Sequence, residues 1–204
     1  MIAIIDYDAG NLKSLSNALK KNNISYEIIS NPKSFENFTH FILPGVGSYS
    51  EAINELKKRN FDKYISDIFN NNIPMLGICL GMQLFSNYGY EDDKSKGLGI
   101  IDGNVISINN LNPSKNIHVG WNNVNLKQDS KIFEGINLNC ELYFVHSYHF
   151  ECIKNDNILC TSYYNKEFTS GICKKNVIGL QFHPEKSHNH GLKILKNFYN
   201  NFNA

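Results

Sequence analysis

The chain reads PMLGICLGMQ from Pro74 to Gln83, a short apolar run followed by residues that favour a helix. Cys79 stands at the junction, with Gly77 and Gly81 two residues away on either side. This spacing is the G-x-S-x-G pattern of a nucleophile elbow, with sulfur in place of oxygen. Glycines suit it because a strand that turns sharply into a helix leaves no room for neighbouring Cβ atoms. The pattern predicts that Cys79 is a nucleophile at a helix N-terminus, where the dipole favours thiolate. A buried structural cysteine in a tight turn is the alternative.

A second apolar run, Val177–Phe182, ends in the tripeptide His183-Pro-Glu185. A thiol nucleophile needs a base within hydrogen-bond reach and an acid that orients this base. Proline restricts the backbone between His183 and Glu185, so both side chains can project from one rigid turn. The same tripeptide also occurs in ordinary surface loops. Its combination with the cysteine elbow, each at the end of an apolar strand, predicts a catalytic triad of Cys79, His183 and Glu185.

The first half of the chain alternates between strand and helix patterns, which is typical of a parallel sheet covered on both faces. Apolar runs predict strands at Met1–Ile5, Tyr26–Ile29, His40–Leu43 and Pro74–Ile78. The spacing of apolar residues predicts helices at Asn11–Asn22, Ser50–Arg59, Phe61–Asn70 and from Leu80 onward. Ligands bind at the carboxyl ends of strands in sheets of this type, and both Cys79 and His183 would emerge there.

Beyond Gly97 the pattern changes to strands and turns, which we expect to form antiparallel additions to the sheet. These strands are predicted at Gly99–Ile108, Val119–Leu126, Leu142–Phe150, Asn157–Tyr164 and Thr169–Lys174. Val177–Phe182 would return to the main sheet, and Leu192–Phe202 has the spacing of a closing amphipathic helix. No repeat or linker divides the chain. We therefore predict one α/β domain over residues 1–204, with a mostly parallel central sheet, flanking helices and antiparallel strand additions in the second half.

Composition argues against several classes of function. The 204 residues carry a formal net charge of +1, without the basic excess of a nucleic-acid surface. No apolar stretch reaches membrane-spanning length, and the first strand lacks the basic start of a signal peptide. The five cysteines are odd in number and lack C-x-x-C spacing, which suits a reducing cytoplasm better than disulfides or zinc. We expect a cytoplasmic protein with neither nucleic acid nor membrane as partner. Four cysteines have no predicted role: Cys140, Cys152, Cys160 and Cys173.

The histidines do not suggest a metal site. His146 and His149 are expected on opposite faces of one strand. His188 and His190 have no cysteine or carboxylate frame around them. Structural or surface roles are favoured, and neither a metal nor a cofactor is expected.

Together these residues identify a family. Three segments resemble the class I (triad) glutamine amidotransferases: PGVG at 44–47, GICLGMQ at 77–83 and HPEKS at 183–187. Three more resemble, more narrowly, the glutaminase subunits of imidazole glycerol phosphate synthase: DYDAGNLKS at 6–14, HVGWN at 118–122 and YFVHSY at 143–148. The likeness spans essentially the whole chain in the expected order.

The resemblance implies hydrolysis of L-glutamine to glutamate and ammonia. Cys79 would attack the side-chain amide carbon, His183 would protonate the departing nitrogen and then activate water, and Glu185 would orient the imidazole. The ammonia would pass to a cyclase partner, the (β/α)8-barrel synthase subunit, in a heterodimer. It would react there with a ribulosyl nucleotide of histidine biosynthesis and give imidazole glycerol phosphate and aminoimidazole carboxamide ribonucleotide.

An oxyanion hole is also implied. The backbone N–H of Leu80 would be one donor, because it follows the elbow nucleophile. The loop Gly45-Val46-Gly47 would supply the other, and its glycines permit a peptide flip that switches activity. An ordinary Gly-rich loop is the alternative.

The resemblance places glutamine against Gln83, one helical turn beyond the nucleophile, and against Glu91, whose carboxylate can pair with the substrate ammonium. Main-chain groups of Gly47, Ser147 and Tyr148 are further candidates. Glu91 lies in an acidic run that could instead be a solvated loop.

Four residues match family positions that face the synthase barrel: Asn11, Trp121, Asn122 and Lys186. Trp121 could instead fill the core, and Lys186 could be a plain surface lysine. Ile117 and Asp102 stand where the family usually has proline. Both fall in the partner-facing half, so they bear on the identity of the partner more than on the chemistry.

Three other interpretations stay open. The same glutaminase chemistry could feed a homologous barrel that amidinates a cell-surface sugar. A non-catalytic binding module on this fold is disfavoured by the intact triad. A thiol protease or another cysteine hydrolase would share the elbow, but it leaves Gln83 and the whole-chain likeness without an explanation.

Overall fold

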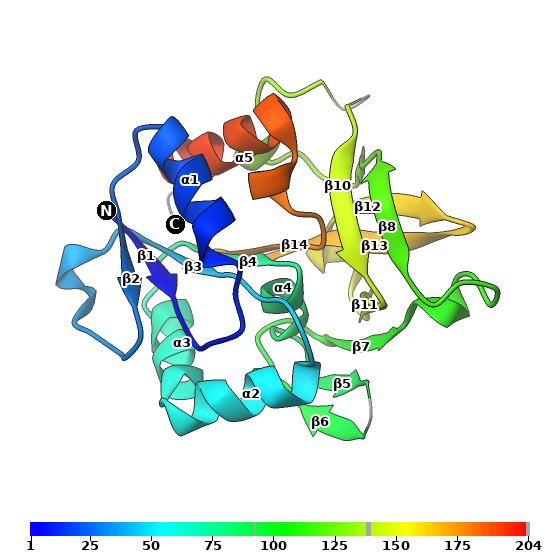
Figure 1. Ribbon diagram of the computed structural model, residues 1–204, viewed down its shortest axis with the longest axis horizontal. Coiled ribbons are helices and arrows are strands. Elements are labelled where there is room, and N and C mark those ends of the chain that lie inside the picture. The colour runs from blue at the N-terminus through cyan, green and yellow to red at the C-terminus, as the bar shows by residue number, and fades with distance from the viewer. Residues whose placement is uncertain (92, 138–139, 203–204) are drawn as a thin grey trace.

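The computed structural model describes residues 1–91, 93–137 and 140–202, and it has helices on both sides of one long sheet (Figure 1). The parallel part of this sheet has the strand order β2-β1-β3-β4-β14. Its strands are β1 (Ile2–Ile5), β2 (Tyr26–Ile29), β3 (His40–Leu43), β4 (Met75–Ile78) and β14 (Val177–Leu180). All but the edge strand β2 are buried along their whole length, as expected for parallel strands covered on both faces.

Two pairs of helices cover the parallel strands, one pair on each face (Figure 1). Ile2 and Ile4 of β1 belong to the core formed with α1 (Leu12–Lys21) and α5 (His188–Asn201). The intervening Ala3 and Ile5 belong to the opposite core, formed with α2 (Tyr49–Lys58) and α3 (Phe61–Asn70). This alternation is the period of a strand. Each fully buried isoleucine contributes about 1.5–3 kcal/mol relative to an exposed one.

The sheet continues beyond β14 with mostly antiparallel strands. In sheet order they are β13 (Lys166–Lys174), β11 (Tyr148–Cys152), β7 (Gly103–Ser107), β5 (Tyr88–Tyr90) and β6 (Lys94–Lys96). Beside this path, β12 (Ile158–Tyr164) pairs with β13 and with β9 (Asn125–Leu126). A separate antiparallel pair is formed by β8 (His118–Asn122) and β10 (Leu142–His146).

The remaining elements are short. The helix α4 (Leu80–Gln83) follows β4 directly. Turns of 3₁₀ helix lie in the connections: η1 (Phe35–Asn37), η2 (Ile108–Asn110), η3 (Lys131–Phe133), η4 (Asn155–Asn157) and η5 (Pro184–Lys186).

The structure confirms the predicted α/β architecture, and β2, β3 and α3 have the predicted bounds. The second half corrects two predicted strands, because 119–126 divides into β8 and β9, and 142–150 divides into β10 and β11. The second break occurs at Ser147, where the chain leaves the β8–β10 pair and joins β7 in the main sheet. An apolar pattern does not encode such a change of partner strand. The predicted strand 99–108 begins only at Gly103, and the polar hairpin β5–β6 had no strand signal.

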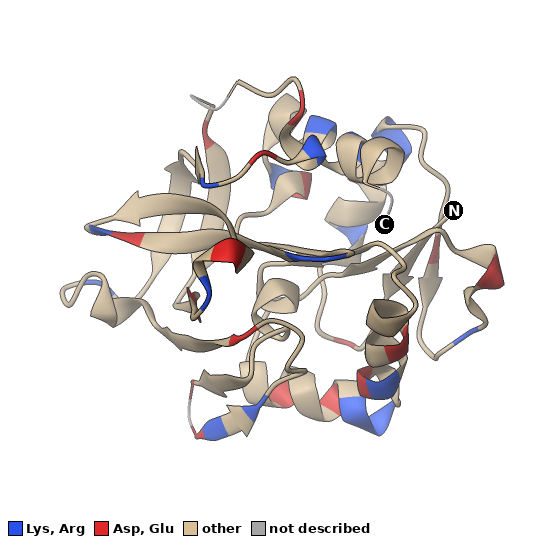
Figure 2. Cartoon of the chain, turned by 180° about the vertical axis from the view of Figure 1, so that it is seen from behind, with Lys and Arg blue, Asp and Glu red and all other residues tan. Residues whose placement is uncertain are grey.

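Among the described residues, no helix is both long and apolar enough to cross a membrane. In the view of Figure 2, Lys and Arg are interspersed with Asp and Glu, in agreement with the near-zero net charge of the sequence.

Candidate active site

Cys79 occupies a sharp junction between β4 and α4. Its backbone has φ 53° and ψ −110°, a region that costs a non-glycine residue about 1–3 kcal/mol. Close packing explains the flanking glycines. A Cβ on Gly81 would lie 1.8 Å from the carbonyl oxygen of Leu43, and one on Gly77 would lie 2.5 Å from the Phe85 ring. The sequence therefore folds into the predicted elbow, and the Cys79 side chain stands at its apex.

His183 and Glu185 lie on the turn η5 after β14 and form a close pair. Nδ1 of His183 donates to Oε1 of Glu185 at 2.7 Å, and the two side chains are only 2% and 5% exposed. The backbone of His183 is held as well, because its N–H donates to the Tyr143 carbonyl at 2.8 Å and its carbonyl accepts from Ser187 Oγ at 2.7 Å. The carboxylate therefore sets both the orientation and the tautomer of the imidazole.

The other ring nitrogen of His183, Nε2, makes no hydrogen bond of regular geometry and faces the sulfur of Cys79. Burial alone would lower the pKa of His183. The neighbouring Cys79 sulfur and the Glu185 carboxylate outweigh burial and raise this pKa to about 10. Such a shift favours the imidazolium form of His183. The geometry thus brings all three predicted triad residues together.

Cys79 opens into a pocket of about 460 Å³. Most of the predicted substrate and oxyanion residues line it: Val46, Gly47, Leu80, Gln83, Glu91, Ser147 and Tyr148. Val145 and His146 of β10 also line the pocket, although the sequence singled out neither for it. The Val145 carbonyl oxygen lies 3.7 Å from Cys79 Sγ.

Gln83 is buried and its amide is fixed by two hydrogen bonds. Its Nε2 donates to the Tyr148 carbonyl at 2.8 Å and to Oε1 of Gln181 at 3.0 Å. Gln181 in turn directs its own Nε2 at the Cys79 sulfur, 3.6 Å away. Sequence reasoning missed Gln181. The sequence did contain a sign of its role, because Gln181 is a polar residue within the apolar run 177–182. A polar side chain in a buried strand needs a hydrogen-bond partner.

In the loop Gly45-Val46-Gly47, the predicted oxyanion donor of Val46 is engaged elsewhere in the protein. The N–H of Val46 donates to the carbonyl of Ala9 at 2.7 Å, while Gly47 has φ 103°. Gly45 packs against the elbow, since a Cβ there would lie 2.9 Å from the Gly81 nitrogen. The N–H of Leu80 has no acceptor within the part of the chain that the structure describes. One predicted oxyanion donor is therefore free, and a peptide rotation would be needed to present Val46.

Glu91 connects the pocket to the start of α2. Its Oε2 accepts from the backbone N–H of Tyr49, the first residue of that helix, and its carbonyl accepts from Tyr148 Oη at 3.3 Å. Ser48, at the N-cap position, makes no side-chain capping bond, so Glu91 fills that role from a distance in sequence. Glu91 is accordingly a half-buried pocket residue and not part of a solvated acidic loop.

Two of the main-chain candidates at the pocket, the carbonyls of Ser147 and Tyr148, are engaged within the protein. The Ser147 carbonyl accepts from the N–H of Ile108 at 2.9 Å, and the Tyr148 carbonyl accepts from Gln83.

Trp121 is 42% exposed and does not fill the core. Its ring stacks on the exposed His188, with centroids 4.8 Å apart and planes at 4°, and it meets Tyr143 edge-on. Lys186 lies over the ring of Tyr143, with Nζ 5.6 Å from the ring centroid. Lys186 therefore has a specific contact beside the active site.

The two other predicted partner residues differ from this arrangement. Asn11 is exposed and caps α1 through its Oδ1, which accepts from the N–H of Ser14 at 3.4 Å. Asn122 directs its amide inward, to Nε2 of His118 and to the carbonyl of Tyr163.

The predicted placement of two histidines was wrong. His146 and His149 belong to separate strands, β10 and β11, because the chain changes sheet between them. Within the described residues, no group of three or more His, Cys, Asp or Glu side chains could hold a metal ion.

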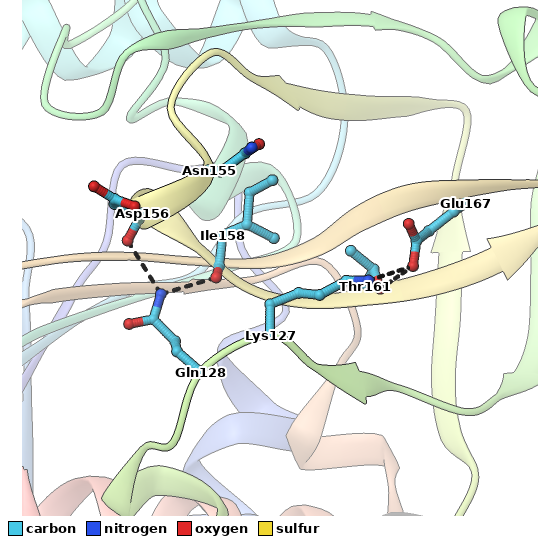
Figure 3. Close-up of a pocket in the computed structure, with 7 residues that line it drawn as sticks. All are labelled: Lys127, Gln128, Asn155, Asp156, Ile158, Thr161 and Glu167. Atoms are coloured by element: carbon cyan, nitrogen blue, oxygen red, sulfur yellow. Dashed lines mark hydrogen bonds and ion pairs between the residues drawn. The ribbon is translucent and has the colours of Figure 1, made fainter.

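A larger pocket, of about 670 Å³, lies near β9, β12 and β13 (Figure 3). Four of its polar side chains already make hydrogen bonds or ion pairs within the protein. Lys127 pairs with Glu167 at 2.7 Å, Thr161 donates to Glu167 at 2.8 Å, and Gln128 donates to two carbonyls. Its lining residues include neither a cysteine nor a histidine that could activate a nucleophile, so we place the chemistry at Cys79.

Comparison with known proteins agrees with this geometry. The family Glutamine amidotransferase class-I matches residues 3–202. The chain is 41% identical over 201 residues to imidazole glycerol phosphate synthase subunit HisH of Sulfurimonas denitrificans, with 97% of each chain covered. It is 42% identical over 201 residues to subunit HisH 1 of Methanococcus maripaludis, with 97% and 98% covered. Subunit HisH of Pelagibacter ubique is 38% identical over 205 residues, with 98% and 99% covered.

Solved structures share the fold at low sequence identity. One is a chain of PurLQS from Thermotoga maritima, with a TM-score of 0.77, 17% identity and 98% and 97% of the two chains covered. Another is a glutamine amidotransferase from the same organism, with a TM-score of 0.69, 19% identity and 97% and 95% covered.

Proposed function

Because the chain belongs to the class I glutamine amidotransferases, and within them to the HisH subunits of imidazole glycerol phosphate synthase, we propose that it is a glutaminase that supplies ammonia for histidine biosynthesis. The observation that carries this proposal is the buried His183–Glu185 pair facing Cys79, at the wall of a pocket that Gln83 lines. A triad and the hydrogen-bonded amide of Gln83 at one pocket suit hydrolysis of a carboxamide.

The chemistry proceeds in two steps. The Cys79 thiolate attacks the side-chain amide carbon of glutamine, and the imidazolium of His183 gives its proton to the departing nitrogen, which leaves as ammonia. The resulting thioester is then attacked by water, whose proton returns to His183, and glutamate leaves as the thiolate is restored. Glu185 holds the imidazole in the required tautomer and stabilises its charged form through the 2.7 Å hydrogen bond.

The negative oxygen formed in both steps needs N–H donors. Leu80 is in position to supply one from the elbow. Val46 supplies the second after its peptide rotates away from Ala9, so the loop acts as a switch. An oxyanion donor accounts for about 2.7–4 kcal/mol of barrier, and a loop that withholds one holds the enzyme nearly inactive.

The partner is a (β/α)8-barrel cyclase, bound as a heterodimer in the cytoplasm. An exposed set of apolar side chains, the partner face, is formed by Ile117, Val119 and Trp121 on and before β8. Trp121 and Lys186 contact Tyr143, whose carbonyl holds the backbone of His183. A cyclase that covers this face would receive ammonia close to the triad and form imidazole glycerol phosphate and aminoimidazole carboxamide ribonucleotide.

Replacement of the nucleophile tests the proposal. In the complex with the cognate cyclase, Cys79→Ala should abolish synthesis from glutamine and leave synthesis from ammonium salts intact, because the cyclase still receives its nitrogen. Cys152→Ala is the matched control, since it removes a sulfur outside the pocket and should retain both activities. Glutamine-dependent turnover by Cys79→Ala would refute the proposed chemistry.

Growth tests the pathway. The gene and that of its cognate barrel should together restore growth without histidine to a strain that lacks its own synthase. Failure to grow, with glutaminase activity present, would assign the ammonia to another acceptor.

A further inference from the structure

Two buried histidines, His118 and His146, connect Asn122 of β8 to the glutamine pocket by hydrogen bonds of fixed direction. Both are at most 6% exposed and they lie opposite each other on β8 and β10. Nδ1 of His118 and Nε2 of His146 are 3.0 Å apart. The proposed chemistry assigns no step to either residue.

The hydrogen-bond network determines which atoms carry the protons. The Tyr148 carbonyl can only accept, so Nδ1 of His146, 2.8 Å away, must donate. Nε2 of a neutral His146 is then an acceptor, and Nδ1 of His118 must be its donor. Nε2 of His118 accepts in turn from the amide of Asn122 at 3.3 Å. Both rings are therefore Nδ1–H tautomers, which is the less common form of neutral histidine in water.

Both rings stay neutral at physiological pH. Burial, with a smaller contribution from the adjacent His118, lowers the pKa of His146 to about 3. Burial likewise lowers the pKa of His118 to about 4. The ring of His118 is also held sterically, since it stacks on Tyr164 and Phe144 with centroids 4.3 and 5.0 Å away.

The Tyr148 carbonyl accepts from two donors, Nδ1 of His146 and Nε2 of Gln83, both at 2.8 Å. Gln83 donates its second amide hydrogen to Oε1 of Gln181. Its Oε1 is then the atom available to accept from an N–H of the substrate. The orientation of Gln83 therefore depends on a carbonyl that the histidine pair holds in place.

We propose that His118 and His146 are positioning residues for glutamine binding. Their directional hydrogen bonds fix the Tyr148 carbonyl, and this carbonyl fixes the amide of Gln83 so that Oε1 faces the substrate. The inference rests on the proposed glutaminase activity of the same pocket.

Two substitutions of His118 separate positioning from packing. His118→Phe keeps a ring between Tyr164 and Phe144 but has no N–H for His146. His118→Asn loses the ring, but its amide can place an N–H where Nδ1 stood. In the complex with the cyclase, His118→Phe should raise the KM for glutamine about tenfold, the size of one lost buried hydrogen bond, with kcat little changed. His118→Asn should return KM toward the wild-type value.

A matched control is His149→Phe, which removes another buried histidine whose ring takes no part in this chain of hydrogen bonds. Its KM should equal that of the wild type. The opposite ranking, with His118→Phe normal and His118→Asn impaired, would show that His118 serves packing alone and would overturn the inference. A wild-type complex without glutaminase activity would instead remove the proposed function.

The tautomers can be measured without any variant. Two-dimensional 15N–1H spectra of the histidine rings should show both His118 and His146 as neutral Nδ1–H forms. An Nε2–H form of either ring would overturn the inference even if the variants did not fold.

Discussion

At the scale of single residues, the site depends on a buried pair of charged side chains, His183 and Glu185. His183 and Glu185 are almost fully buried, and an isolated buried imidazolium would be unfavourable. The carboxylate on one side and the sulfur on the other reverse that preference and raise the pKa of His183 to about 10, against an ordinary value of 6.5. Burial therefore strengthens the ion pair that catalysis needs, because few water molecules compete with it.

This shift predicts a pH dependence of stability. A folded-state pKa above 6.5 means that the folded protein binds this proton more tightly than the unfolded chain does. The contribution to the free energy of unfolding is complete below pH 6.5 and is lost as pH rises through about 10. Glu185→Gln can still accept a hydrogen bond from Nδ1 but has no charge, so the pKa of His183 should fall. Urea denaturation between pH 6.5 and 10 should then show a smaller loss of stability than in the wild type.

The control is Glu151→Gln, which removes an exposed carboxylate on β11 and should leave the wild-type pH dependence unchanged. Identical curves for Glu185→Gln and the wild type would contradict the role given to the carboxylate.

At the scale of elements, the elbow and the oxyanion loop are packed together but differ in freedom. The elbow is locked by close contacts, such as that of Gly81 with the Leu43 carbonyl. The oxyanion loop is held at Val46 by one hydrogen bond to Ala9, and Val46 and Gly47 are exposed. One net hydrogen bond contributes about 0.5–1.5 kcal/mol, so the loop can change conformation while the elbow cannot.

Removal of the Val46 N–H should strongly slow glutamine hydrolysis. Val46→Pro deletes the N–H, so neither conformation of the loop can use it, and kcat in the complex should fall about 10²–10³-fold. Val46→Ala keeps the N–H and trims an exposed side chain, so it should retain most of the activity. Steady-state ammonia release from both variants is the measurement. Equal activity of the two would show that Val46 is not an oxyanion donor.

At the scale of the whole molecule, the site joins two parts of the sheet. Cys79 and His183 follow adjacent parallel strands, β4 and β14, whereas Val145, His146 and Tyr148 come from the antiparallel region. The partner face lies on that second region, next to the pocket. A partner that binds there therefore contacts β8, which pairs directly with the pocket strand β10.

Trp121 gives a direct readout of this docking, because it is the single tryptophan and is 42% exposed. Addition of the cognate cyclase should shift the fluorescence emission of Trp121 to shorter wavelength, because docking excludes water from its ring. Glutaminase activity, low in the isolated chain, should rise over the same titration when the cyclase ligand is present. High turnover without partner would contradict the switch at Val46. Activation without any change in emission would place the interface elsewhere.

The sequence by itself determined the parallel half of the fold and the triad. Strands such as Ile2–Ile5 are apolar throughout and short, so their pattern suffices to predict them. The elbow around Cys79 was predictable because its backbone conformation demands glycines at set positions. The resemblance then carried the assignment to Gln83 and Trp121, which residue chemistry alone left open.

Only the tertiary structure decided how the strands of the second half pair. It also decided which groups hold the side chains of the glutamine pocket in place. The exchange of sheets at Ser147, the Gln181 contact to the sulfur and the His118–His146 pair all join residues far apart in sequence. A local pattern reports whether a side chain is buried, but not which polar group meets it there. Packing of the complete chain fixes hydrogen-bond partners, among them those of His118 and His146 and the bond from the Val46 N–H to the Ala9 carbonyl.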